Sequence, residues 1–388
     1  MPDFSNLLIL MVVVWTAGKI FRYFKLPVVF GELLGGLIVG PALLGIVNPE
    51  SETLKILAEL GVFFLMLHAG LETDHKQLFK TSKQSFLIAL SGMAVPFFGG
   101  YYVSTLFGQN LITSLFIGMG LSISAIPVAV RLLRDCGLNG TRLANLALGA
   151  AVIDDIMAII IFSVIISLAE TGSIALIPLA WLVIKILLFF GIVIIGGVKV
   201  SPYLNKVIYF GNKAFTLTLI IALVMGLIAE YIGLHIIVGA FLAGLFVREE
   251  VIDKHAFKKI EDRIYGLSYS FLGPIFFASV AFNIDFTAVT TVPLFFVVII
   301  ITAMAGKIIG GGGMAYLLKT KPMEALAIGL AMNNRCAVEL IIASIGLQMG
   351  IIDQNIFSIL VMMVLITTLT SILLMTPVAN AIKRSRQI

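Results

Sequence analysis

The chain has 388 residues, of which 60% are hydrophobic and only 12% are charged. A soluble domain carries about 25% charged residues, so this composition excludes an ordinary soluble enzyme or binding module. The formal net charge of +5 could indicate a nucleic-acid partner, but the basic residues are distributed in a way that argues against one. Two cysteines, Cys136 and Cys336, provide neither a disulfide framework nor a cysteine-ligated metal centre, and no cofactor is expected.

Thirteen hydrophobic segments follow one another along the chain. A spanning helix needs about 20 apolar residues. By that measure the segments lie at about 4–24, 28–46, 53–71, 84–107, 112–134, 142–169, 174–198, 214–231, 233–247, 264–283, 291–318, 323–347 and 354–382. We therefore predict an all-α polytopic membrane protein with 13 transmembrane helices.

The basic residues alternate between loops. If there are thirteen spans, 22 of the 26 Lys and Arg residues lie in or beside every second loop, and the other loops contain only Lys55. An excess of Lys and Arg marks the cytoplasmic loops of a membrane protein. We therefore expect a multi-pass protein of the cell membrane, with the N-terminus outside and the C-terminus in the cytoplasm.

Two stretches of the chain resemble each other. Residues 26–39 read LPVVFGELLGGLIV and residues 234–247 read LHIIVGAFLAGLFV. Their glycines align in pairs, Gly31 with Gly239 and Gly36 with Gly244. Because an odd number of spans separates the copies, the second has the opposite orientation. This pattern predicts an inverted structural repeat, in which a transporter places its substrate site near the midplane of the bilayer.

Two predicted spans at equivalent positions of the repeat contain features that interrupt a helix. The span at about 112–134 carries Ser122, Ser124 and Pro127, and a proline inside a helix removes a backbone donor and clashes with the preceding turn. The span at about 323–347 carries polar side chains at its centre, namely Asn333, Asn334, Arg335 and Glu339. We predict two broken helices that cross near the midplane. A simple kink at Pro127 is the alternative.

Asp154 and Asp155 stand side by side in an apolar segment. A charged side chain at the bilayer centre costs about 2.5–3.5 kcal/mol on insertion scales. Adjacent helical residues project about 100° apart, so the two carboxylates cannot face one partner. Since Arg335 and Glu339 are four residues apart and can pair with each other, Lys307 is expected to meet one of the two aspartates.

The second aspartate would then point into a cavity, where its carboxylate could hold either a proton or a monovalent cation. Hydroxyls of Ser122 and Ser124, backbone carbonyls and water would complete the shell of the cation. Competition of a proton and a cation for one carboxylate is sufficient for exchange. The alternative is that the aspartates only join helices.

These motifs together resemble the monovalent cation:proton antiporter-2 family of prokaryotic sodium/proton antiporters. The resemblance covers essentially the whole chain and rests on Ser122–Pro127, on Asp154-Asp155 after Gly149-Ala-Ala-Val-Ile, on Pro274-Ile-Phe-Phe-Ala-Ser-Val, on Lys307 and on Met332–Leu340. It implies that Asp155 carries the cation and the proton and that Asp154 forms an ion pair with Lys307.

The family fold implies a dimerisation bundle from about 1–71 and 203–283, a linker helix at about 174–198 and a core transport bundle from about 84–169 and 291–382. Transport would follow an elevator-like alternating-access movement in a homodimer. Potassium-efflux relatives commonly carry Gln where this chain has Asp154. The resemblance therefore favours electrogenic exchange of Na⁺ for protons, with K⁺ or Li⁺, or a K⁺/H⁺ exchanger, as alternatives.

Two other functions are compatible with this polytopic chain, and a third is not. A sodium-coupled symporter for an organic anion has a similar architecture and could use Arg335 to bind the anion. A passive channel would need no opposing proton gradient. An intramembrane aspartyl protease needs two aspartates that face each other and share a proton, which adjacent residues on one helix cannot provide.

Overall fold

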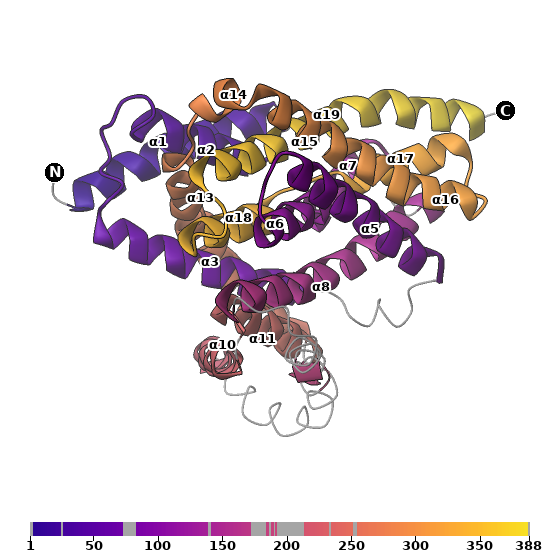
Figure 1. Cartoon of the computed structure of the whole chain (residues 1–388). Coiled ribbons are helices and arrows are strands. Elements are labelled where there is room, and N and C mark those ends of the chain that lie inside the picture. Colours follow the sequence, from indigo (N-terminus) through magenta and orange to yellow (C-terminus); the bar gives the residue numbers. More distant parts are fainter. Residues whose placement is uncertain are drawn as a thin grey trace. The chain divides into compact units, whose positions relative to one another are not determined.

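The structure is a computed structural model that describes residues 3–24, 26–72, 83–138, 141–171, 213–232, 234–250 and 254–386, with a few positions between 184 and 191. Every regular element among these residues is a helix (Figure 1). The predicted linker helix at about 174–198 lies largely outside the described residues. The chain divides into two compact units, one of Met1–Tyr23, Gly31–His75 and Ser163–Phe282, the other of Phe24–Phe30, Lys76–Phe162 and Asn283–Ile388.

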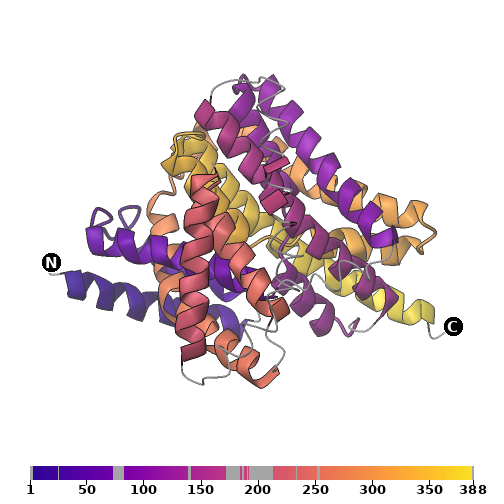
Figure 2. The ribbon, with the colours of Figure 1, turned by 90° about the horizontal axis from the view of Figure 1, so that it is seen from below.

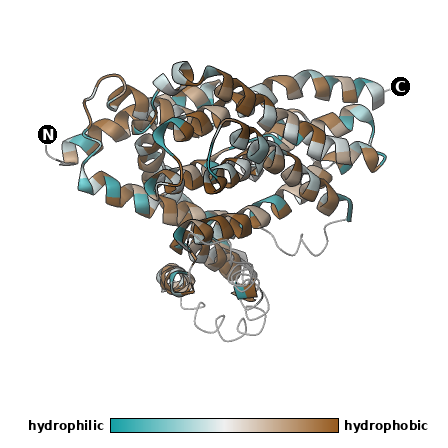
Figure 3. Ribbon diagram, in the orientation of Figure 1, coloured by the Kyte–Doolittle hydropathy of each residue, from teal (hydrophilic) through white to brown (hydrophobic). Residues whose placement is uncertain are grey.

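Eight of the described helices are long and apolar enough to cross a membrane. A ninth span is obtained if α17 (Pro322–Met332) and α18 (Ala337–Gln348), which are bent by 44° relative to each other, form one broken span. Hydrophobic residues predominate along these helices (Figure 3). The predicted total of thirteen also counts three shorter apolar helices and the segment outside the described residues, so that total stays a prediction.

The first unit contains helices from both halves of the chain. They are α1 (Asp3–Tyr23), most of α2 (Val28–Val39), α3 (Glu52–Glu72), α10 (Lys213–Tyr231), α11 (Ile236–Glu250), α12 (Lys254–Leu267), the π-helical turn η1 (Ser268–Leu272) and α13 (Gly273–Phe282).

The predicted span at 28–46 is too long, because α2 ends at Val39. Gly40 and Pro41 follow, and a residue before proline is disfavoured in the helical region.

Two of the aligned glycines lie against the helix that precedes their own. A Cβ atom at Gly31 of α2 would lie 2.6 Å from the carbonyl oxygen of Ala17 in α1. A Cβ atom at Gly239 of α11 would lie 2.3 Å from the carbonyl oxygen of Met225 in α10. Small residues at such positions let two helix backbones approach closely in a membrane. The helix pairs α1–α2 and α10–α11 therefore pack through equivalent positions.

The other two aligned glycines lie against a helix from the opposite half of the chain. A Cβ atom at Gly36 of α2 would lie 2.5 Å from the carbonyl oxygen of Ala278 in α13. A Cβ atom at Gly244 of α11 would lie 2.1 Å from the carbonyl oxygen of Leu67 in α3. Thus α2 packs against α13, which follows α11 in the chain, and α11 packs against α3, which follows α2.

Replacing Gly70 by alanine is expected to lower the melting temperature of the detergent-solubilised protein. The added Cβ atom would lie 2.0 Å from the carbonyl oxygen of Phe241, and forcing extra atoms into a packed contact typically costs about 1–3 kcal/mol. The matched control is Gly266→Ala, because a Cβ atom at Gly266 of α12 meets nothing within 4 Å. Equal melting of the two variants would contradict the close approach of α3 and α11.

The second unit contains the remaining helices. They are α5 (Lys83–Leu106), α6 (Leu111–Ser122), α7 (Ile126–Asp135), most of α8 (Arg142–Thr171), α14 (Thr287–Thr291), α15 (Pro293–Lys307), the π-helical turn η2 (Ile308–Gly312), α16 (Gly313–Leu317), α17, α18 and α19 (Gln354–Arg386). The last of these, drawn in yellow, runs to the C-terminus (Figure 2).

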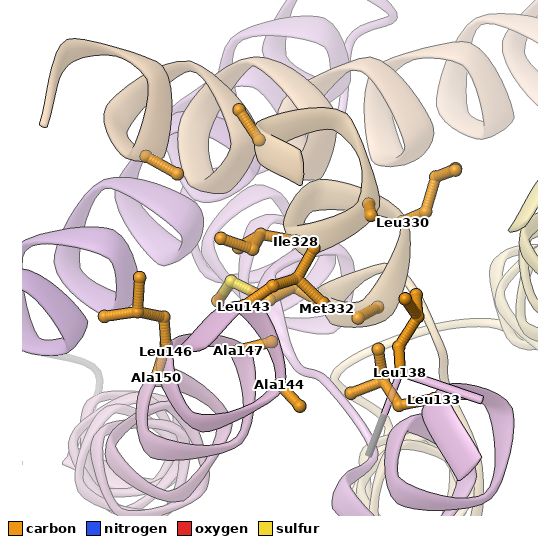
Figure 4. Packing of buried hydrophobic residues seen from close by; sticks show 14 of the residues in the cluster. Leu133, Leu138, Leu143, Ala144, Leu146, Ala147, Ala150, Ile328, Leu330 and Met332 are labelled. Carbon is orange, nitrogen blue, oxygen red and sulfur yellow. The ribbon is translucent and has the colours of Figure 1, made fainter. Parts of the chain in front are cut away.

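A buried apolar cluster fixes α8 against its neighbours in this unit. Leu143, Ala147 and Ala150 of α8 belong to it together with Ile328 and Met332 of α17 (Figure 4). Close packing of this kind leaves little freedom for a helix to rotate about its axis. The cluster includes Ile153, the residue directly before Asp154, so it sets the direction in which the two aspartates project.

Candidate functional site

The first broken span consists of α6 and α7, separated by an extended stretch at residues 123–125. The break therefore precedes Pro127, which lies in the first turn of α7 rather than at the interruption itself. A proline in the first helical turn loses no hydrogen bond, because the amide groups there have no partner within the helix. The Ser122 hydroxyl donates to the carbonyl oxygen of Met119, at 2.7 Å, and so satisfies a carbonyl near the end of α6.

The second broken span consists of α17 and α18, separated by residues 333–336. Ending α17 inside the protein leaves backbone carbonyls without helical partners. The amide nitrogen Nδ2 of Asn334 donates to two of them, to Ala331 at 2.9 Å and to Leu330 at 3.2 Å. Asn334 is thus a cap for the helix end that the break creates.

The two breaks contact each other. The backbone amide of Ala125 donates to the carbonyl oxygen of Asn334 at 2.7 Å. The guanidinium group of Arg335, which is completely buried, donates through Nη1 to the carbonyl oxygen of Gly120 at 2.6 Å and through Nη2 to that of Leu121. These carbonyls form the C-terminal end of α6, where the helix dipole favours a positive charge.

Glu339 balances the charge of Arg335. Its Oε1 atom lies 3.2 Å from Nη1 of Arg335, and both side chains are buried. Glu339 also lies in the first turn of α18, where a negative charge is favoured by the helix dipole. Arg335 and Glu339 therefore pair as their spacing allows, and they also stabilise one end each of two interrupted helices.

The structure adds two hydroxyl side chains that the sequence analysis missed, those of Thr368 and Ser371 in α19. Nδ2 of Asn333 donates to Oγ of Ser371 at 2.9 Å, and the backbone amide of Arg335 donates to Oγ1 of Thr368 at 2.9 Å. The available signal was their clustering within the apolar segment 354–382. Hydroxyls in membrane helices often bond only within their own helix, so that signal alone does not identify a site.

Asp154 forms a buried ion pair with Lys307. Oδ2 of Asp154 lies 2.9 Å from Nζ of Lys307, and both side chains are completely shielded from solvent. Lys307 is the last residue of α15, and the glycine-rich turn η2 follows it. A Cβ atom at Gly310 in that turn would lie 2.4 Å from the carbonyl oxygen of Ser91, so the glycine lets α5 pack closely against the turn that follows Lys307.

Asp155 differs from its neighbour in exposure. It is partly exposed, whereas Asp154 is buried, in agreement with the different directions of adjacent helical residues. The side-chain oxygens of Ser124, Asn333 and Asn334 are buried, as is Oδ1 of Asp154, and none of these atoms has a hydrogen-bond partner among the described residues. Carboxylate, hydroxyl and amide oxygens are ligands suited to hard cations. The second unit therefore contains the kinds of oxygen ligand that a cation site requires.

In the described part of the chain, no three His, Cys, Asp or Glu side chains converge in a way that could hold a metal ion. A cation at this site would therefore depend on a mixture of carboxylate, hydroxyl and carbonyl oxygens rather than on a cluster of acids.

Comparison with known proteins gives consistent results. The model of the family described as "Sodium/hydrogen exchanger, transmembrane" matches residues 7–378. The "Probable Na(+)/H(+) antiporter GerT" of Bacillus cereus is 32% identical over 361 residues, which cover 92% of this chain and 94% of that protein. A "Na(+)/H(+) antiporter" of Enterococcus hirae is 32% identical over 377 residues, 96% of this chain and 97% of that protein.

Among solved structures, the sodium proton antiporter MjNhaP1 of Methanocaldococcus jannaschii matches with a TM-score of 0.76 and 18% identity, covering 97% of both chains. At this identity the likeness concerns the fold.

Proposed function

The chain belongs to the family of transmembrane sodium/hydrogen exchangers, and from this premise we propose that it is an electrogenic antiporter that exchanges protons for a monovalent cation, with Na⁺ favoured. Antiport of a cation against protons is the activity that the family matches support. The preference for Na⁺ and the transfer of net charge go beyond them.

The observation that carries the proposal is the difference between the two adjacent aspartates. Asp154 is buried and engaged by Lys307, so its charge is already compensated. Asp155 is the more exposed of the two carboxylates and lies on the same helix. We assign to Asp155 the alternation between a proton and a cation, because a carboxylate can hold either one but not both at once.

The broken helices supply the supporting groups. Ser122 ends α6 and Ser124 lies within the first break, so both residues place a side-chain hydroxyl where the helix is interrupted. Asn333, Asn334, Arg335 and Glu339 hold the second break through the hydrogen bonds described above. In our proposal the serine hydroxyls and freed carbonyls complete the cation shell, while the four residues of the second span keep the backbone in place.

Alternating access would involve a movement of one unit against the other. The division of the chain into two compact units supports an elevator-like mechanism, in which the unit that contains Asp155 is the transport core. We further propose thirteen spans, an external N-terminus, a cytoplasmic C-terminus and a homodimer. The contacts of the four aligned glycines support the inverted repeat, because each contact made by a glycine of α2 has an equivalent made by the aligned glycine of α11.

The proposal is tested by reconstituting the purified protein in proteoliposomes with a pH indicator inside. An imposed outward or inward Na⁺ gradient is expected to drive protons in the opposite direction, with weaker responses to Li⁺ and K⁺. A membrane potential should change the rate if exchange is electrogenic. Absence of cation-dependent proton movement, in vesicles where a known antiporter responds, would contradict the proposed function. A passive channel would conduct Na⁺ without moving protons.

A further inference from the structure

One hydroxyl group on α19 satisfies both polar main-chain groups of a residue in the second break. The amide of Arg335 donates to Oγ1 of Thr368 at 2.9 Å, and the same hydroxyl donates to the carbonyl oxygen of Arg335 at 3.0 Å. Thr368 is completely buried. In an intact helix these two groups would bond to other turns of that helix, but here the helix is interrupted.

Holding the main chain of Arg335 has consequences for both breaks. The side chain of Arg335 carries the guanidinium group that caps α6 at Gly120 and Leu121. Directly before it, the carbonyl oxygen of Asn334 accepts the hydrogen bond from Ala125 of the first break. A displacement at Arg335 would therefore move the end of α6 and the extended stretch that contains Ser124.

Neighbouring hydroxyls of α19 make different contacts. Thr367 donates to the carbonyl oxygen of Met363 and Thr370 donates to that of Ile366, each one turn back on the same helix. Hydrogen bonds of this kind satisfy the hydroxyl without involving another element. Thr368 is therefore distinguished from Thr370 by the direction of its hydroxyl, although both are threonines on the same helix.

We propose that Thr368 is a positioning residue for cation binding. It acts through the main chain of Arg335 to hold the oxygen atoms of both breaks in position. The inference rests on the proposed cation/proton exchange. Thr368 does not touch the carboxylate of Asp155 in this account. Its contribution is to keep the oxygens that surround the cation arranged before the cation arrives, which reduces the cost of binding.

The test compares near-isosteric variants in the proteoliposome assay. Thr368→Val removes the hydroxyl and keeps the shape of the side chain. It is expected to raise the apparent KM for Na⁺ about tenfold, which corresponds to about 1.4 kcal/mol, with a smaller effect on the maximal rate. Thr368→Ser keeps the hydroxyl and is expected to stay within about twofold of the parent. Thr370→Val is the matched control and is expected to leave the KM unchanged.

The inference would be overturned if Thr368→Val had the same KM as Thr370→Val, or if only the maximal rate fell. If Thr368→Val cannot be purified in a folded form, Thr368→Ser and Thr368→Ala are compared, since they differ only in the hydroxyl. Equal KM values for that pair would also overturn it. Failure of the proposed function is recognised separately, because the parent protein would then show no Na⁺-dependent proton movement.

Discussion

Replacing Lys307 by alanine is expected to lower the free energy of unfolding by about 3–5 kcal/mol, the usual cost of removing one partner from a buried ion pair. Both side chains of the pair are completely shielded, and Nζ of Lys307 lies 2.9 Å from Oδ2 of Asp154. The substitution leaves the Asp154 carboxylate in an environment of low dielectric without a compensating charge. The melting temperature in detergent at fixed pH measures the effect.

Two controls separate the lost pairing from the lost side chain. Lys321→Ala removes an exposed lysine of the same unit, at the start of α17, and is expected to melt like the parent. The double variant Asp154→Asn with Lys307→Met removes both charges and is expected to recover most of the lost stability, since neutral replacement of a buried pair is often tolerated. If Lys307→Ala melted like Lys321→Ala, the pair would contribute nothing and its structural role would be wrong.

Replacing Asp155 by asparagine is expected to abolish Na⁺-driven proton movement altogether. An asparagine side chain has nearly the shape of aspartate, but it neither takes up nor releases a proton near neutral pH and carries no charge to bind a cation. Because Asp155 is partly exposed, the folded protein should still be obtained. Asp262→Asn is the matched control on an exposed position of α12 and should transport like the parent.

The same assay distinguishes the proposed roles of the two aspartates from the reverse assignment. In our account the double variant without the Asp154–Lys307 pair keeps some cation-dependent proton movement, because Asp155 is still present. Exchange that persists in Asp155→Asn but is lost in the double variant would assign proton and cation binding to Asp154 instead.

Much of the second unit could be predicted from the sequence because charge and proline are rare at bilayer depth. The first break lies at residues 123–125, close to Ser122, Ser124 and Pro127, and the second at residues 333–336, within the polar run. Lys307 meets one of the two aspartates, as expected from the few basic residues outside the predicted cytoplasmic loops. In each case a residue that is unfavourable at that depth is accommodated by a helix break or by an ion pair.

Other features depend on contacts that hydropathy does not encode. Nothing in the sequence distinguishes Thr368, which bonds to another span, from Thr370, which bonds to its own helix. The π-helical turns η1 and η2 were also missed, because their residues read as ordinary apolar helix. The early end of α2 follows from Gly40 and Pro41, but the apolar residues beyond them obscured it. Which direction a side chain takes is decided by packing between helices.

The central claim is that Asp155 exchanges a proton for a cation while Asp154 stays paired with Lys307. Proton release on addition of Na⁺ to the detergent-solubilised protein in weakly buffered solution tests it most directly, because a carboxylate must lose its proton to bind the ion. We predict that the parent releases protons in a saturable manner and that Asp155→Asn releases none. Unchanged release in Asp155→Asn, or saturable Na⁺ binding by the parent without any release, would contradict the account.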